Sequence, residues 1–239
     1  MKLFVAIAAV AATVFAQDFN STGVSENQEQ GIRVVGGEEA PVGQYTWTVN
    51  LRSTAGGYSL CGGTLIAPDY VLTAAHCVAN GKPGFEAYYG FDVAVLKLSR
   101  ASKFAPLPLA KDEVAAQTSV KLFGWGQTSG PSGSNSVVLK ENTFVVRSNA
   151  ECQTRLRATN NYRWWTATAT HLCAGGDVGQ ASCFGDSGGP LVKSTSSGLA
   201  LVGVVSFGEP CAKGFPDVYG RVAAFRAFID QASRGHTWV

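Results

Sequence analysis

The fold is decided by the stretch Gly185-Asp186-Ser187-Gly188-Gly189-Pro190, in which one serine lies between glycines. Glycines beside a serine let the backbone come close to a reacting group, and their N–H groups can point at a developing negative charge. A serine hydroxyl is a poor nucleophile unless a neighbouring base removes its proton during attack. Taken alone, the run could also be a plain glycine-rich turn. Its interpretation therefore depends on what the rest of the chain supplies.

Two other segments supply the groups that a serine nucleophile needs. Thr73-Ala74-Ala75-His76-Cys77 carries a histidine, and Phe91-Asp92-Val93-Ala94-Val95-Leu96 carries an aspartate in an apolar run. Histidine titrates near neutral pH and can act as a general base, and a buried carboxylate orients the imidazole. Alone, His76 could be structural, and Asp92 could be a charge that protects a strand edge. Together, in the order His, Asp, Ser, they predict Ser187 as nucleophile, His76 as base and Asp92 as its orienter.

The composition predicts an all-β protein. Hydrophobic residues make up 46% of the 239 residues and charged residues only 15%, with 28 glycines, as in chains of many short strands and turns. The predicted strands are Thr46–Arg52, Gly63–Ile66, Tyr70–Thr73, Asp92–Leu98, Val120–Phe123, Val137–Val146, Pro190–Lys193, Leu199–Phe207 and Pro216–Val222. Apolar residues at helical spacing predict a helix over Ala223–Ala232. A division into two halves is expected within Ser102–Gln117.

The N-terminal segment predicts secretion. Lys2 precedes an apolar run from Leu3 to Phe15, and a small-residue cleavage site ends at Ala16. Residues 1–16 are therefore expected to be a signal peptide, and the polar residues 17–33 a propeptide. The run is too short to span a bilayer comfortably, so a membrane anchor is disfavoured. A net charge of +2 gives no reason to expect nucleic-acid binding.

Six cysteines in a secreted chain predict three disulfides, although composition cannot choose among their 15 pairings. The sequence contains no Cys-x-x-Cys motif, so we expect no zinc or redox site. No other metal motif is evident, and neither a metal nor a cofactor is expected.

The ordered motifs resemble those of the trypsin-like serine proteases. They are Arg33 to Gly37, Cys61 to Ile66, Thr73 to Cys77, Asp92 to Leu98, Gly124 to Gly126, Cys183 to Pro190 and Val205 to Gly208. The resemblance implies a protease domain over 34–239 with two antiparallel Greek-key β-barrels, over about 34–110 and 111–225, and a C-terminal helix. It also implies an oxyanion hole from the N–H groups of Gly185 and Ser187. The implied disulfides are Cys61–Cys77, Cys152–Cys173 and Cys183–Cys211.

The same resemblance implies activation by cleavage. A cut after Arg33 would free the α-amino group of Val34, which in the family pairs with the aspartate beside the nucleophile, here Asp186. Each buried charge needs the other, because burying one alone costs several kcal/mol. We therefore expect the uncut chain to be inactive.

The resemblance places the specificity pocket at Ala181, Ser182, Ser206, Phe207, Gly208 and Asp217. Ser206 to Gly208 would offer a strand edge to substrate backbone. Ala181 stands where trypsins have an aspartate, whereas Asp217 adds a carboxylate on the neighbouring wall, as in crustacean collagenolytic proteases. A mixed or basic preference is expected. If Asp217 points away or is capped by hydrogen bonds, the preference would instead be apolar.

One stretch departs from the family. Only 16 positions separate His76 from Asp92, which is roughly 29 fewer than usual, or about two strands of the first barrel. This count predicts a truncated first barrel. Losing the buried side chains of those strands would cost on the order of 10 kcal/mol, comparable to the stability of a whole domain. The missing stretch includes the calcium loop of some relatives. A coding segment absent from the sequence, a shortened protein with little activity and a shortened active protease all remain open.

The motifs therefore predict a secreted, monomeric serine endopeptidase that acts on proteins or peptides through an acyl-enzyme and that protein inhibitors could bind. The alternative is a protease homologue, weakly active or inactive, that acts as a binding or inhibitor protein. Cys61 to Pro68 and Ser148 to Cys152 resemble the glucanase inhibitor proteins of oomycetes, which have typically lost triad residues. This chain keeps all three.

Overall fold

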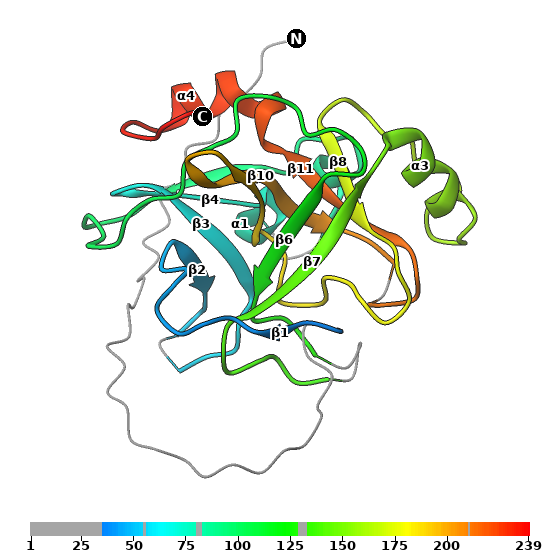
Figure 1. Ribbon diagram of the computed structural model, residues 1–239, viewed down its shortest axis with the longest axis horizontal. Coiled ribbons are helices and arrows are strands. Elements are labelled where there is room, and N and C mark those ends of the chain that lie inside the picture. Colours follow the sequence, from blue (N-terminus) through cyan, green and yellow to red (C-terminus); the bar gives the residue numbers. More distant parts are fainter. Residues whose placement is uncertain (1–34, 55, 80–82, 129–132, 210) are drawn as a thin grey trace.

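The computed structural model describes residues 35–54, 56–79, 83–128, 133–209 and 211–239, and the expected signal peptide, propeptide and Val34 lie outside them. Two β-sheets dominate the fold; helices α3 and α4 lie at its periphery, and α1 lies behind the strands near the middle of the view (Figure 1). The strands are β1 (Glu38–Glu39), β2 (Thr48–Leu51), β3 (Cys61–Ala67), β4 (Tyr70–Thr73), β5 (Ala94–Lys97), β6 (Ser119–Gly124), β7 (Lys140–Arg147), β8 (His171–Gly175), β9 (Pro190–Thr195), β10 (Gly198–Phe207) and β11 (Pro216–Arg221). The helices are α1 (Ala75–Ala79), α2 (Phe85–Tyr88), α3 (Asn149–Arg157), the 3-10 helix η1 (Val222–Phe225) and α4 (Arg226–Ala232).

The larger sheet closes into a six-stranded antiparallel barrel. Its strand order is β1-β7-β6-β9-β10-β11-β8, and β8 also pairs with β7, while β1 only extends β7 outside the ring. The buried interior includes Leu122, Phe144, Leu172, Leu191 and Tyr219. Closure leaves the barrel strands without free edges. The barrel expected for the second half is therefore confirmed.

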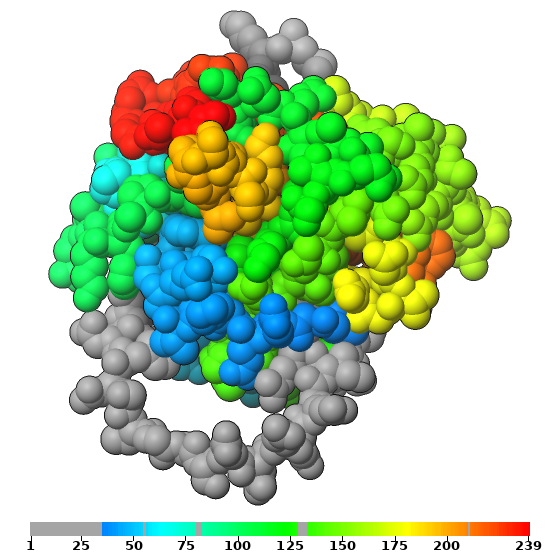
Figure 2. Space-filling model, viewed as in Figure 1, coloured from blue at the N-terminus to red at the C-terminus, as the bar shows by residue number. Residues whose placement is uncertain are grey.

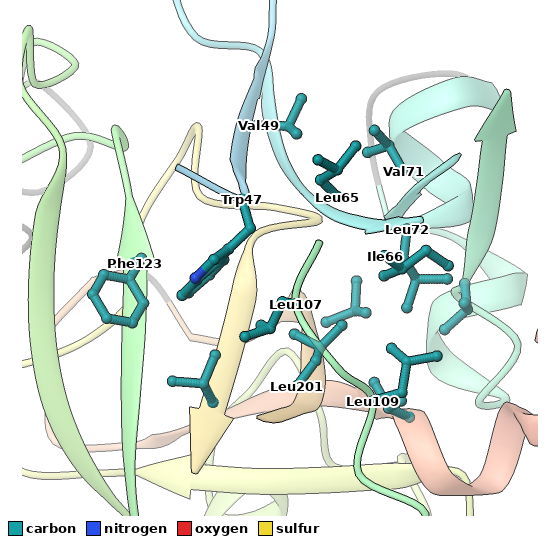
Figure 3. Close-up of a cluster of buried hydrophobic side chains, with 14 of the residues drawn as sticks. Trp47, Val49, Leu65, Ile66, Val71, Leu72, Leu107, Leu109, Phe123 and Leu201 are labelled. Carbon is teal, nitrogen blue, oxygen red and sulfur yellow. The ribbon is translucent and has the colours of Figure 1, made fainter. Parts of the chain in front are cut away.

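The smaller sheet is open and has only four strands, in the order β2-β3-β4-β5. It is the truncated first barrel that the short His76–Asp92 segment predicts. Its apolar core continues into the interface with the second barrel, as Figure 3 shows for Trp47, Leu65, Leu72, Phe123 and Leu201. The first half therefore buries much of its apolar surface against the second barrel.

Unpaired polar atoms mark the incomplete first sheet. Among the described residues, eight buried side-chain polar atoms have no hydrogen-bond partner, and four of them belong to Asn50, Arg52 and Thr64, in or next to β2 and β3. Each such atom costs about 1–3 kcal/mol. The first sheet is therefore the less well satisfied half of the molecule.

All nine predicted strand ranges overlap an observed strand, and the predicted C-terminal helix corresponds to η1 and α4. Strands β1 and β8 and helices α1, α2 and α3 were not predicted. Helix α3 carried a readable signal, because the Ser148 hydroxyl accepts a hydrogen bond from Glu151 N at 3.1 Å, as in a Ser-x-x-Glu capping box. None of the described helices is long and apolar enough to cross a membrane.

Covalent and terminal contacts tie the structure together. The disulfides are Cys61–Cys77, Cys152–Cys173 and Cys183–Cys211, which are the pairs that the resemblance implies. The chain end returns to the connection between the two halves, where Leu109 N donates to Thr237 O at 2.8 Å and Val239 N donates to Leu109 O at 2.9 Å. In Figure 2 this red segment adjoins the green surface of the connection.

Candidate active site

The structure joins two of the three predicted catalytic groups directly. His76 lies in α1, just after β4, and Asp92 lies just before β5. The imidazole Nδ1 and the Asp92 Oδ2 are 2.7 Å apart, and the backbone N–H of His76 donates to Asp92 Oδ1 at 2.9 Å. Both side chains are buried. The carboxylate thus holds both the ring and the backbone of the histidine.

Ser206 is a third partner of this carboxylate. Its buried hydroxyl donates to Asp92 Oδ2 at 2.5 Å, across 114 residues of sequence. The resemblance assigned Ser206 to the substrate pocket, but its side chain serves the imidazole–carboxylate pair. Nothing local in the sequence connects the two residues, so only the fold could reveal this contact.

Ser187 lies at the junction of the two halves. Its carbonyl accepts a hydrogen bond from Gly62 N at 2.7 Å. The next residue, Gly188, has φ +78°, and a Cβ there would lie 2.2 Å from Thr73 Oγ1 and 2.6 Å from Gly62 O. Only glycine fits both that backbone conformation and that space. The serine turn is therefore locked against the first sheet.

Ser187 and His76 flank one disulfide sulfur atom. Cys77 Sγ lies 3.8 Å from His76 Nε2 and 3.5 Å from the carbonyl oxygen of Ser187. Within the described ranges, no hydrogen bond joins the Ser187 hydroxyl to the imidazole. The His76 side chain is 0% exposed. The third group of the predicted triad is thus a neighbour of the pair without being bonded to it.

The backbone of the predicted oxyanion hole is held in place by hydrogen bonds. Phe184 O accepts from Gln127 N at 2.8 Å, and Gly185 O accepts from the Ser59 hydroxyl at 3.3 Å. Gly185 has φ +97°, a conformation that glycine adopts without strain. These bonds fix the peptide planes on either side of Gly185. That its N–H and that of Ser187 stabilise an oxyanion stays a prediction.

Asp186 is fully buried behind the serine turn. Its oxygens accept from Gly126 N at 2.7 Å and Cys183 N at 2.9 Å. Burial raises the pKa of Asp186 to about 6, although these two bonds act in the opposite direction. Over the described residues, no basic side chain forms an ion pair with it. Arg33 and Val34 lie outside the described residues, so activation stays a prediction.

Asp217 lies at the predicted pocket and is capped. Its Oδ2 accepts from Ser182 N at 2.6 Å, next to buried Ala181, and a Cβ on Gly208 would lie 2.6 Å from its Oδ1. Burial raises the pKa of Asp217 to about 7, and the negative charge of Asp186 acts in the same direction. The carboxyl is therefore only partly ionised near neutral pH.

The far end of the predicted strand edge is covered by a loop that sequence reasoning missed. Phe207 packs in an aromatic cluster with Tyr88, Tyr162 and Trp165, with ring centroids 5.1, 5.4 and 5.5 Å from its own. The buried Tyr162 hydroxyl donates to Gly208 O at 2.9 Å, and burial raises the pKa of that phenol. Gly208 O, at the end of the predicted strand edge, thus already accepts one hydrogen bond.

Among the described residues, one cluster of potential metal ligands is present, formed by Cys61, His76 and Cys77. The two cysteines are joined in a disulfide, and the imidazole is bonded to Asp92. These sulfur atoms are not thiolates, so the cluster lacks the ligands that a metal would need.

Comparison with known proteins gives the family. The trypsin family model matches residues 34–90 and 81–229. Glucanase inhibitor protein 1 of Phytophthora sojae is 35% identical over 269 aligned positions, which cover 96% of this chain and 98% of that protein. Glucanase inhibitor protein 4 of Phytophthora infestans is 35% identical, covering 83% and 88%. A trypsin of Saccharopolyspora erythraea is 36% identical, covering 80% and 94%.

The alignments also bear on the short segment. The 269 aligned positions exceed the 239 residues of this chain, so the inhibitor protein carries residues that this chain lacks. The family model matches in two separate pieces whose boundaries overlap at residues 81–90, between His76 and Asp92. Both observations agree with the gap that the sequence indicates. From its matched length and its fold, the chain belongs to the trypsin family.

Proposed function

We propose that this chain is a secreted member of the trypsin family that binds and inhibits another secreted hydrolase, with a glucanase as the first candidate. Relatives named glucanase inhibitor proteins align with up to 98% of the chain, whereas the bacterial trypsin aligns with 80%. A partner protein, rather than a peptide substrate, is then what the molecule recognises. As in the sequence-based expectation, the inhibitor would be a monomer before it binds.

The observation that carries this proposal is the closure of the site. A general base must reach the proton that it removes, within about 3.2 Å or through one water. The His76 imidazole has no exposed surface, and its Nε2 faces the Cys77 sulfur at 3.8 Å. The Tyr162 hydroxyl also occupies one acceptor position of Gly208 O, at the end of the predicted substrate edge. These contacts support binding without turnover.

The surface around the serine turn suits a protein partner. Several large apolar side chains next to or between the site segments are exposed, among them Phe85 at 69%, Leu60 at 59%, Phe91 at 58%, Phe184 at 56% and Tyr89 at 52%. Protein interfaces are rich in aromatic side chains at their core. Phe184 precedes Ser187 by three residues, so a partner that covers Phe184 would bury apolar surface next to the serine turn.

A second candidate is the serine endopeptidase, because the chain keeps the complete His76–Asp92–Ser187 set with an intact imidazole–carboxylate bond of 2.7 Å. In this mechanism His76 Nε2 takes the Ser187 hydroxyl proton while Oγ attacks the substrate carbonyl. His76 then gives that proton to the leaving amine, and water hydrolyses the acyl-enzyme by the same two steps. Cleavage after Arg33 and rearrangement around Asp186 would have to open the site first.

For this second candidate, the Asp217 carboxyl would set the side-chain preference. Since the Ser182 N–H caps it and its pKa is about 7, its attraction for lysine or arginine would be partial. A mainly apolar preference, as expected for a capped Asp217, with only partial acceptance of lysine and arginine, follows. Peptides ending in Arg, Phe and Leu would distinguish these cases.

The test uses the secreted chain before and after cleavage at Arg33, with Ser187→Ala as the matched variant. Inhibition is measured as the loss of glucanase activity on a soluble glucan, and nucleophile activity as labelling of Ser187 by a fluorophosphonate probe. If the chain acts by binding, the wild type and Ser187→Ala should inhibit the glucanase equally, and the probe should not label Ser187. Labelling of the cleaved chain together with peptide hydrolysis, and no glucanase inhibition, would overturn the binding proposal in favour of the endopeptidase.

A further inference from the structure

The short segment between His76 and Asp92 lies against the second barrel instead of refilling the first sheet. Ala87 is fully buried in a cluster with Cys152, Leu156 and Trp165, and Tyr88 packs against the same cluster. Cys152 and Leu156 belong to α3, in the second half of the chain. The segment that delivers the catalytic-type aspartate is thus anchored on the opposite half of the molecule.

Two side chains of the second half hold this segment by its backbone. His171 Nε2 contacts Ala87 O at 3.0 Å, and Trp165 Nε1 donates to Tyr88 O at 3.1 Å. His171 Nδ1 accepts from Thr168 N at 2.9 Å. Because Nδ1 accepts, it carries no proton, so Nε2 carries the proton and donates it to Ala87 O. The ring is neutral and uses both of its nitrogens.

Gly90 completes the fit between the two halves. Its φ is +83°, and a Cβ there would lie 2.0 Å from Thr170 Oγ1 and 2.5 Å from Thr168 Oγ1. Gly90 N also donates to Ala87 O at 3.1 Å. The carbonyl that His171 holds is therefore part of the turn that ends two residues before Asp92.

We propose that His171 is a positioning residue for Asp92, and that it supplies support which the missing strands of the first sheet do not give. By fixing Ala87 O it fixes the turn at Gly90, and through that turn the carboxylate that bonds the backbone N–H and the ring Nδ1 of His76. This inference goes beyond the proposed function, since it concerns how the site is held and applies whether Ser187 cleaves or the protein only binds.

The contact has a defined pH dependence. Protonation of His171 would put a proton on Nδ1, opposite the Thr168 N–H, so that a donor faces a donor. Burial lowers the pKa of His171. Two charged groups face the ring: Arg221 on β11 also lowers this pKa, whereas Asp92 raises it. The stability that the contact gives the segment is complete above the ordinary histidine pKa of about 6.5. It declines as the pH falls from that value toward the lowered pKa of the buried ring, because the opened segment is protonated first.

The test measures hydrogen-exchange protection of residues 83–91 and the low-field NMR signal of the His76 Nδ1 proton. His171→Leu removes the donor and is expected to lower protection in this segment about tenfold, as expected for one lost hydrogen bond, and to broaden the signal. His171→Gln keeps an amide donor and should restore both. His236→Gln, a histidine bonded to Asp230 near the C-terminus, should change neither.

Unchanged protection and an unchanged signal in His171→Leu would overturn the proposal. If that variant does not fold, the wild-type protein decides: protection of 83–91 should fall between pH 7 and pH 5 more than in β9 and β10. A uniform fall over all segments would count against the proposal. Neither readout needs peptide cleavage or glucanase inhibition, so failure of the proposed function leaves this test intact.

Discussion

Replacing either of two buried threonines on neighbouring strands of the open sheet is expected to change the stability of the protein in opposite directions. Thr64 on β3 and Thr73 on β4 are both 0% exposed. The Thr73 hydroxyl donates to Gly62 O at 2.8 Å, whereas the Thr64 hydroxyl has no partner among the described residues. Valine has nearly the shape of threonine, so Thr64→Val and Thr73→Val form a matched pair that differs only in the lost hydrogen bond.

The magnitudes follow from the two environments. A buried hydroxyl without a partner costs about 1–3 kcal/mol, and the methyl group that replaces it adds about 0.8 kcal/mol of burial. Thr64→Val is therefore expected to raise the free energy of unfolding by about 2 kcal/mol, or the Tm by about 4–8 °C for a domain of this size. Thr73→Val leaves a carbonyl without its donor and is expected to lower the free energy by about 1–2 kcal/mol.

Urea unfolding of the wild type and both variants, followed by tryptophan fluorescence, measures these differences directly. A constant m-value would show that each change acts on stability alone. If Thr64→Val destabilises the protein as much as Thr73→Val does, the Thr64 hydroxyl has a partner in solution. The four-stranded sheet would then not be the sheet that the folded protein contains, and the reasoning from its missing strands would be refuted.

Three further predictions concern charged and buried groups. Burial raises the pKa of Asp217 to about 7, so the wild type should lose stability relative to Asp217→Asn as the pH rises from about 4 to 7, by on the order of 3 kcal/mol. Urea unfolding at pH 5 and pH 8 measures this difference. Asp177→Asn, at an exposed aspartate, is the control and should show no such trend. Cleavage after Arg33 should raise the Tm at pH 8, since the new α-amino group gives Asp186 an ion-pair partner, and calorimetry of Asp186→Asn should show no gain. Ser206→Ala removes a buried hydrogen bond to a carboxylate and should cost about 2 kcal/mol; urea unfolding indistinguishable from wild type would contradict that role.

Much of the candidate site could be predicted because its signals are local. Glycines around Ser187, an aspartate in an apolar run and a histidine after a strand are each visible within about six residues. The nine strand predictions rest in the same way on short runs of β-type residues bounded by turns. The short His76–Asp92 spacing predicted the truncated first sheet by simple counting.

The sequence by itself therefore determined which residue types the site contains, where most strands run and that part of one barrel is absent. Only the tertiary structure decided what those residues contact. The hydroxyl of Ser206 on Asp92, the ring of His171 on Ala87 O and the N–H of Ser182 on Asp217 join residues 114, 84 and 35 positions apart. Such contacts depend on how whole strands pack, and no local pattern of residues encodes that packing.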